Sequence, residues 1–138
     1  MIAGSPERCF AVVTDVERYP EWVSDVKQVD VLERDGEGRA SVVRFRAGAF
    51  GRSTSYVLAY DYSEAPAELS WTQREGDITR SLDGCYRFAP IADGSTDVAY
   101  ELEVELRVPM PNFVRRRAEG HIIHAAVRDL KSRVESGA

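Results

Sequence analysis

The chain has 138 residues, of which 43% are hydrophobic and 30% are charged, and its formal net charge is −5. This balance predicts one globular domain over residues 1–138 and excludes a disordered chain. The acidic balance argues against general nucleic-acid binding, and the absence of a long apolar run or a signal-peptide core predicts a cytoplasmic protein without a membrane span.

The first element is predicted to be a short helix. Ser5-Pro6-Glu7 combines an N-cap residue with a first-turn proline and acid, and an apolar stripe at helical spacing follows. Pro20 is expected to end this helix, because the residue before a proline is pushed out of the helical region. The sequence 20–23 then predicts a second, shorter helical turn.

The apolar period changes to two after this point, which predicts strands joined by tight turns. The first strand has an irregularity near Gln28 and leads to a hairpin turn at 35–38. Its partner is expected over 41–46, with the next turn at 48–51. A third strand carries alternating aromatic residues up to Tyr62 and is broken by Ala65-Pro66, and two further strands follow around Trp71 and Tyr86.

The last strand has the clearest pattern, with apolar residues from Val98 to Val108 alternating with charged residues from Asp97 to Arg107. One face is therefore predicted to be buried and the other solvated. A long helix is expected from Asn112, its predicted N-cap, to Glu135. Its apolar stripe is formed by Ile123, Val127, Leu130 and Val134.

This order of elements resembles the START-like (SRPBCC) superfamily, in its polyketide cyclase/dehydrase-like and coenzyme-Q-binding branch. The residues that carry the resemblance are Ser5-Pro6-Glu7, Asp15 with Tyr19-Pro20-Glu21-Trp22, Asp35-Gly36, Gly84-Cys85-Tyr86-Arg87-Phe88, and the last strand and helix. It implies an α+β helix-grip fold, a curved antiparallel β-sheet wrapped around a long C-terminal α-helix, with two short helices after the first strand. It also implies a cavity between sheet and helix, with Trp22 at one end as core residue or ligand contact.

Superfamily members usually open with a full strand, whereas only Met1-Ile2-Ala3 precedes the first helix here. We therefore expect that strand to be very short, or the start to be truncated. A missing edge strand would expose the last strand to pairing with another chain, which makes a homodimer through that edge a candidate assembly.

The inward strand positions, Tyr62 included, are rich in tyrosine, and a buried tyrosine hydroxyl needs a hydrogen-bond partner. Together with the resemblance, this favours a mostly apolar pocket over a solid core. The predicted ligand contacts are Trp22, Phe45, Tyr56, Leu58, Tyr60, Trp71, Tyr86, Phe88, Tyr100, Leu102 and Ile123.

Signals for catalysis or metal binding are weak. No GxSxG, P-loop or GxGxxG motif occurs, and Cys9 and Cys85 are predicted to be buried, reduced thiols. His121 and His124 have no companion ligand and are expected on the helix surface, so no metal and no cofactor are predicted. In the aromatase/cyclase branch, the resemblance implies a catalytic Arg where Tyr60 stands here. A tyrosine cannot supply that fixed charge.

Three features of the charged and glycine residues leave alternatives open. Arg44, Arg46 and Arg87 are expected on the solvated face of the sheet. The run 115–117 is all arginine, and positive charge near a helix start opposes the helix dipole. This arginine run is interpreted as a solvated cluster, as a site for an acidic headgroup, or as an RNA or ribosome contact. Gly120 either lets a ligand or the sheet approach the helix closely or marks a kink in the helix.

The favoured hypothesis is a non-catalytic carrier or sensor of an apolar small molecule, which is a lipid, an isoprenoid or an aromatic polyketide. The alternative is a polyketide aromatase/cyclase or dehydratase with Tyr60, Tyr100 or His121 as proton donors. A second alternative is a ribosome-associated interaction module like that of the superfamily's toxin-like branch, acting through the arginine run.

Overall fold

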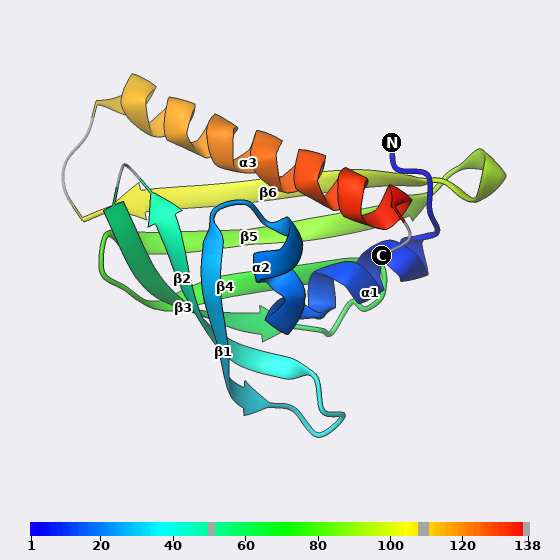
Figure 1. The fold of residues 1–138 in the computed structure, drawn as a ribbon, viewed down its shortest axis with the longest axis horizontal. Helices are drawn as coiled ribbons and strands as arrows, with labels where there is room; N and C mark the ends of the chain where they lie inside the picture. Colours follow the sequence, from blue (N-terminus) through cyan, green and yellow to red (C-terminus); the bar gives the residue numbers. More distant parts are fainter. Residues whose placement is uncertain (50–51, 108–110, 137–138) are drawn as a thin grey trace.

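The computed structural model of the protein describes residues 1–49, 52–107 and 111–136. Its elements, in chain order, are α1 (Pro6–Thr14), the 3-10 turn η1 (Val16–Arg18), α2 (Tyr19–Trp22), β1 (Val26–Arg34), β2 (Ala40–Ala49), β3 (Arg52–Asp61), β4 (Glu68–Gly76), β5 (Thr79–Pro90), the 3-10 turn η2 (Ala92–Gly94), β6 (Thr96–Leu106) and α3 (Asn112–Glu135). Within the described residues the strands form one antiparallel sheet in the order β1-β2-β3-β4-β5-β6. The sheet is curved, α3 runs along β6, and α1 and α2 pack near the C-terminal end of α3 (Figure 1). The predicted helix-grip fold is confirmed.

The N-terminal helices begin and end for local reasons. The Arg8 N–H donates a hydrogen bond to Ser5 Oγ at 3.1 Å, and Pro6 lies in the first turn, so the predicted start is confirmed. The predicted end at Pro20 is wrong, because α1 already ends at Thr14 and Pro20 lies in the first turn of α2. A first turn needs no N–H from a proline, so Pro20 starts the second helix instead of ending the first.

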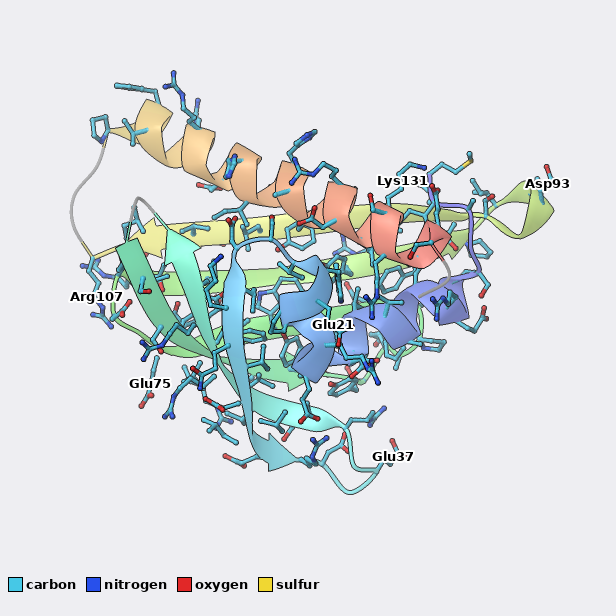
Figure 2. All side chains as sticks on the ribbon, in the orientation of Figure 1. Glu21, Glu37, Glu75, Asp93, Arg107 and Lys131 are labelled. Atoms are coloured by element: carbon cyan, nitrogen blue, oxygen red, sulfur yellow. The ribbon has the colours of Figure 1, made fainter. Side chains whose placement is uncertain are left out.

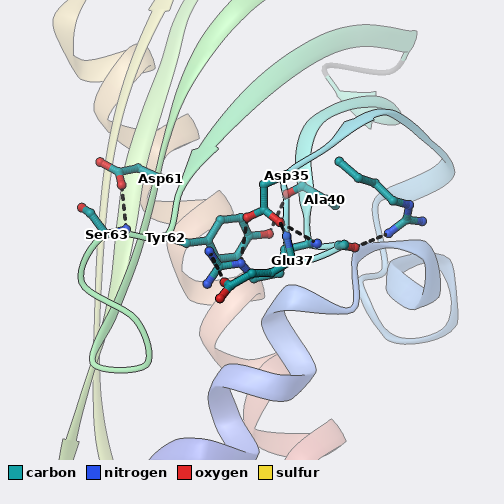
Figure 3. Close-up of polar contacts among 9 residues, drawn as sticks. Asp35, Glu37, Ala40, Asp61, Tyr62 and Ser63 are labelled. Carbon is teal, nitrogen blue, oxygen red and sulfur yellow. Dashed lines mark hydrogen bonds and ion pairs between the residues drawn. The ribbon is translucent and has the colours of Figure 1, made fainter.

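The hairpin between β1 and β2 follows the sequence prediction. The register of the pair shifts between Val26 and Gln28, which confirms the expected irregularity. In the turn, Asp35 Oδ1 accepts hydrogen bonds from the N–H groups of Glu37 and Arg39 at 3.0 and 2.9 Å (Figure 3). The next turn was predicted at 48–51, but β2 continues to Ala49, and residues 50–51 lie outside the described residues.

Tyr62 connects this hairpin to the end of β3. Its hydroxyl donates a hydrogen bond to the Ala40 carbonyl at 2.6 Å, and the guanidinium of Arg39 lies 4.4 Å from its ring centroid (Figure 3). The polar end of Tyr62 is therefore engaged in holding the curved end of the sheet together.

The strand β6 forms one edge of the sheet and has the predicted alternation. Its charged residues at Asp97, Glu101, Glu103 and Glu105 are exposed, while Val104 on the other face is buried. Val108 lies outside the described residues. The expected N-terminal strand is reduced to a single bridge, in which Ile2 pairs with Thr96 at the start of β6. The prediction of a very short first strand beside β6 is confirmed.

The core is closed by the C-terminal half of α3. Leu130 and Val134 are buried in one cluster with residues of α1 and the sheet. Further back, Ile122, Ala125 and Ala126 line the space between α3 and the sheet, while Ile123 and Val127 of the predicted stripe are half-buried outside this lining. Counting back from Leu130 in steps of four gives positions 126 and 122, and the sequence reading missed them by following large side chains only. The helix begins at Asn112, and Pro111 occupies the capping position predicted for Asn112.

In the described part of the chain, no helix combines the length and the apolar character that a membrane crossing requires.

Candidate functional site

A cavity of about 180 Å³ lies between the inner face of the sheet and α3. One water molecule occupies about 30 Å³ of liquid, so the predicted space between sheet and helix is confirmed. Because side chains alternate along a strand, every second residue of β3 and of β6 faces this space. The aromatic residues of the lining are Tyr19, Trp22, Phe45, Tyr56, Tyr60, Trp71, Tyr86 and Tyr100.

The middle of the sheet presents a cluster of four aromatic side chains to the cavity, and we call it the aromatic wall: Tyr60, Trp71, Tyr86 and Tyr100. Trp71 is its centre, with ring centroids of Tyr86, Tyr100 and Tyr60 at 5.5, 5.7 and 6.1 Å. Tyr86 and Tyr100 meet edge to face at 4.7 Å, an arrangement that aromatic rings favour. The four residues come from three neighbouring antiparallel pairs, so the meander itself assembles the wall.

The hydroxyls of the wall are held in the neutral form. Burial raises the pKa values of Tyr60, Tyr86 and Tyr100 well above the ordinary tyrosine value, and nearby tyrosines add to the effect. Burial also raises the pKa of Tyr56, on the neighbouring part of β3, to about 12. These groups are therefore hydrogen-bond donors at any physiological pH and cannot act as bases there.

The indole N–H of Trp71 is a further donor at the wall. Nε1 is buried and has no hydrogen-bond partner among the described residues. Such an orphaned donor costs about 1–3 kcal/mol unless an acceptor reaches it. The indole of Trp71 lies directly over Gly84 on the neighbouring strand. It fits there because Gly84 has no side chain: a Cβ atom at this position would come within 2.8 Å of the ring.

A second aromatic group closes the end of the cavity nearest α2. Tyr19 packs edge to face with Trp22 at 5.1 Å and stacks on Phe45 at 5.8 Å, and its hydroxyl donates a hydrogen bond to the Val13 carbonyl. Trp22 is half-buried and lines the cavity on one side. On its other side it borders a groove formed with Arg8, Arg18 and Arg133. Trp22 therefore separates the cavity from the surface groove and is not part of the fully buried core.

The cavity reaches solvent at the connection between α2 and β1, since the lining residues Ser24 and Asp25 are exposed. This corner is bonded to α3. The carboxylate of Asp129, 13% exposed, accepts hydrogen bonds from the Ser24 N–H at 3.1 Å and hydroxyl at 3.0 Å. Arg133 pairs with Glu21 at 3.0 Å one turn later. The Ser24–Asp129 and Glu21–Arg133 contacts therefore hold α3 beside the opening of the cavity at Ser24 and Asp25.

The structure brings together nine of the eleven predicted contact residues and leaves two out. The nine that line the cavity are Trp22, Phe45, Tyr56, Leu58, Tyr60, Trp71, Tyr86, Tyr100 and Leu102. Phe88 lies beyond the end of the cavity and packs against Phe10, with centroids 6.3 Å apart. Ile123 is displaced from the lining by its neighbour Ile122. Tyr62 also stays outside, because its hydroxyl is bonded to Ala40.

Some lining residues were not predicted. Tyr19 belongs to the Tyr-Pro-Glu-Trp motif, but nothing in the sequence around it indicated that its side chain would line the cavity. Ala125, Ala126 and Ile122 were detectable from the spacing back from Leu130. Asp129 had no sequence signal, because only the fold brings it to Ser24.

The other predicted features lie at the surface or in the core. His121 and His124 are exposed, as expected for the helix surface, and neither is among the residues that line the cavity. A Cβ at Gly120 would meet no described protein atom within 4 Å, so the sheet does not approach the helix closely there. Cys9 and Cys85 are free and buried, as predicted, and burial raises the pKa of both thiols.

The charged residues agree with the expected exposure. Arg44, Arg46 and Arg87 are exposed, so the predicted register of the sheet is confirmed. Arg116 and Arg117 are exposed on α3, while the side chain of Arg115 lies outside what is described. Among the residues that the structure describes, no group of three His, Cys, Asp or Glu side chains is placed to hold a metal ion.

The sequence and the fold were compared with known proteins. The family model described as polyketide cyclase/dehydrase and lipid transport matches residues 2–131. No curated protein matches the sequence significantly. A START superfamily protein from Mycobacterium smegmatis is similar in structure, with a TM-score of 0.93 and 26% identity over 99% of this chain and 94% of that chain.

Two more distant structures share the fold. The Zhui aromatase/cyclase from Streptomyces sp. R1128 has a TM-score of 0.83 and 18% identity, covering 97% of this chain and 88% of its own. A fragment of a STAR-related lipid transfer protein from Xanthomonas axonopodis has a TM-score of 0.71 and 14% identity, covering 97% and 81%. At these identities the likeness concerns the fold alone.

Proposed function

Because the chain belongs to the polyketide cyclase/dehydrase and lipid transport family, we propose that it binds one apolar, ring-bearing small molecule as a carrier or sensor. The observation that carries this proposal is the cavity itself, an aromatic-lined space between sheet and α3. Such spaces, apolar with a few convergent polar groups, are the usual form of small-molecule sites.

The size of the cavity narrows the ligand class. An engineered apolar cavity of about 150 Å³ holds benzene, and typical ligand pockets span about 300–1,000 Å³. At about 180 Å³ the cavity fits a compound of one or two rings. A long isoprenoid or acyl chain would have to extend through the opening at Ser24 and Asp25. Size therefore favours the ring-bearing class over a complete lipid.

The polar groups of the aromatic wall narrow the ligand class further. Tyr60, Tyr86 and Tyr100 keep their protons, and the Trp71 N–H has no partner among the described residues. A wall of donors is matched by a ligand that carries an acceptor, such as an aromatic ketone. One added hydrogen bond contributes about 0.5–1.5 kcal/mol, which corresponds to up to roughly tenfold in affinity.

Tryptophan fluorescence gives a direct test, because both tryptophans of the chain, Trp22 and Trp71, line the cavity. We expect 2-acetonaphthalene to change the emission and raise the melting temperature, and to bind up to about tenfold more tightly than naphthalene. Farnesol and palmitate test the longer ligand classes. A panel in which no compound changes emission or melting would refute the proposal.

A variant that fills the cavity provides the control. Ala126→Phe places a ring in the lining of the cavity, and it should abolish ligand binding while the protein stays folded. Ser132→Phe makes the same change at an exposed position of α3 and should bind as the wild type does. Equal binding by both variants would locate the ligand elsewhere.

An aromatase/cyclase activity is the second candidate. It is favoured by the two proton donors Tyr60 and Tyr100 in one apolar wall and by the shared fold with the Zhui aromatase/cyclase. Within the described lining there is no Arg, Lys or His to stabilise an enolate, which argues for a carrier. Turnover of a poly-β-ketone that Tyr60→Phe abolishes, with ligand affinity retained, would establish the enzyme instead.

A further inference from the structure

The outer face of α3 carries a row of basic side chains. Residues three and four apart share one face of a helix, and this face, which we call the basic face, is defined by Phe113, Arg116, Arg117, His121 and His124. All five side chains are exposed. Arg128 and Lys131 continue the same row toward the C-terminal end of α3, where Lys131 donates a hydrogen bond to the Met1 carbonyl at 3.2 Å (Figure 2).

Two acidic residues of α3 interact with the C-terminal part of this row. Asp129 accepts hydrogen bonds from Ser24 and pairs with Arg128 at 3.3 Å, and Glu135 pairs with Lys131 at 2.6 Å near the helix end. Arg116 and Arg117 form no ion pair with a described side chain, in a protein whose net charge is −5. The outer residues of β6, in contrast, are acidic at Asp97, Glu101, Glu103 and Glu105.

The same face presents a large apolar side chain to solvent. Phe113 is 68% exposed in the first turn of α3. Burial of a phenylalanine is worth about 1.5–3 kcal/mol, and its exposure here stabilises nothing in the fold. Three and four residues later come Arg116 and Arg117, so the apolar and the basic side chains are presented together.

We propose that the basic face docks on an anionic lipid surface, with Phe113 inserted among the acyl chains and Arg116 and Arg117 on the headgroups. Charge complementarity alone would also fit a nucleic acid or an acidic protein. The exposed phenylalanine favours lipid, because Phe113 can be buried among acyl chains while the arginines beside it stay at the headgroups, whereas a nucleic acid or an acidic protein would need only the charges. The 24-residue helix offers a contact about 36 Å long.

The arginines have no comparable role inside the protein. Arg116 and Arg117 are exposed, form no ion pair with a described side chain, and lie beyond the first turn of α3, where the helix dipole acts most strongly, so they contribute little to its stability. Replacing them with glutamine should therefore leave the melting temperature unchanged. A loss of docking in this variant can therefore be distinguished from a loss of fold. Docking of the basic face does not depend on which ligand the cavity holds.

Vesicle co-sedimentation tests the proposal. The full chain should bind vesicles of phosphatidylglycerol and phosphatidylcholine, should not bind pure phosphatidylcholine, and should be released as salt increases. Each basic residue near such a surface contributes about 1 kcal/mol, so Arg116→Gln/Arg117→Gln should weaken binding roughly 30-fold. Phe113→Ser should weaken it at least about tenfold.

A matched variant on the opposite side of the molecule completes the design. Arg44→Gln/Arg46→Gln removes the same charge from exposed positions of β2 and should bind vesicles as the wild type does. Failure of the wild type to bind phosphatidylglycerol vesicles would overturn the proposal, and so would equal losses in the two double variants. Binding of RNA or an acidic peptide in the absence of vesicle binding would assign the face to another partner and also overturn it.

Discussion

The close contact between Gly84 and Trp71 leads to a sharp prediction. Gly84 lies on β5 between Trp71 on β4 and Leu102 on β6. A Cβ at position 84 would come within 2.4 Å of the Glu101 carbonyl oxygen and 2.8 Å of Trp71 Cζ2. Neither atom is the free end of a flexible side chain, so Gly84→Ala must separate the strands and displace the indole.

The expected cost follows from this geometry. Overpacking of this kind typically destabilises a protein by about 1–3 kcal/mol. The loss of chain entropy in the unfolded state offsets about 0.4–1 kcal/mol where the backbone accepts alanine. We therefore expect the free energy of unfolding of Gly84→Ala to fall by up to about 2.5 kcal/mol. The Trp71 emission should change, and the cavity ligand should bind more weakly.

Gly48→Ala is the control, because Gly48 also lines the cavity but a Cβ there would meet nothing within 4 Å. It should be as stable as the wild type or more stable by about 0.4–1 kcal/mol. Urea unfolding followed by tryptophan emission measures both variants. If Gly84→Ala kept wild-type stability and emission, Gly84 would not lie as close to Glu101 and Trp71 as these distances require.

Two further predictions concern the core and the tyrosines. Leu130 is fully buried, so Leu130→Ala should lower the free energy of unfolding by about 2–5 kcal/mol in urea titrations. Val127→Ala, at a half-buried position beside it, should cost much less, and equal losses would contradict the assignment of the helix face. The folded state raises the pKa values of Tyr60, Tyr86 and Tyr100, and that of Tyr56 to about 12, so it retains protons that the unfolded chain releases above pH ~10. Stability present below pH ~10 should therefore be lost as the pH rises toward 12. The ultraviolet absorbance of tyrosinate should appear together with unfolding, and its appearance in the folded protein near pH 10 would contradict the burial of these side chains.

Local signals in the sequence were reliable where one or two residues decide the outcome. Ser5 and Pro6 start α1, Asp35 organises its turn through its own neighbours, and the irregularity near Gln28 is present in the register. The end of α1 was misjudged at Pro20, because a proline is compatible both with the residue after a helix and with the first turn of the next one.

The sequence by itself determined the order of the elements, the inward and outward faces of the strands, and nine of the eleven predicted lining residues. These follow from periods of two and of about 3.6, which depend only on neighbouring positions. The tertiary structure alone decided the rotation of α3 that puts Ile122 and Ala126 over the cavity, the contact of Asp129 with Ser24, and the contact of Gly84 with Trp71. Each of these depends on how far apart two packed elements stand, and that distance is set by all the side chains between them at once.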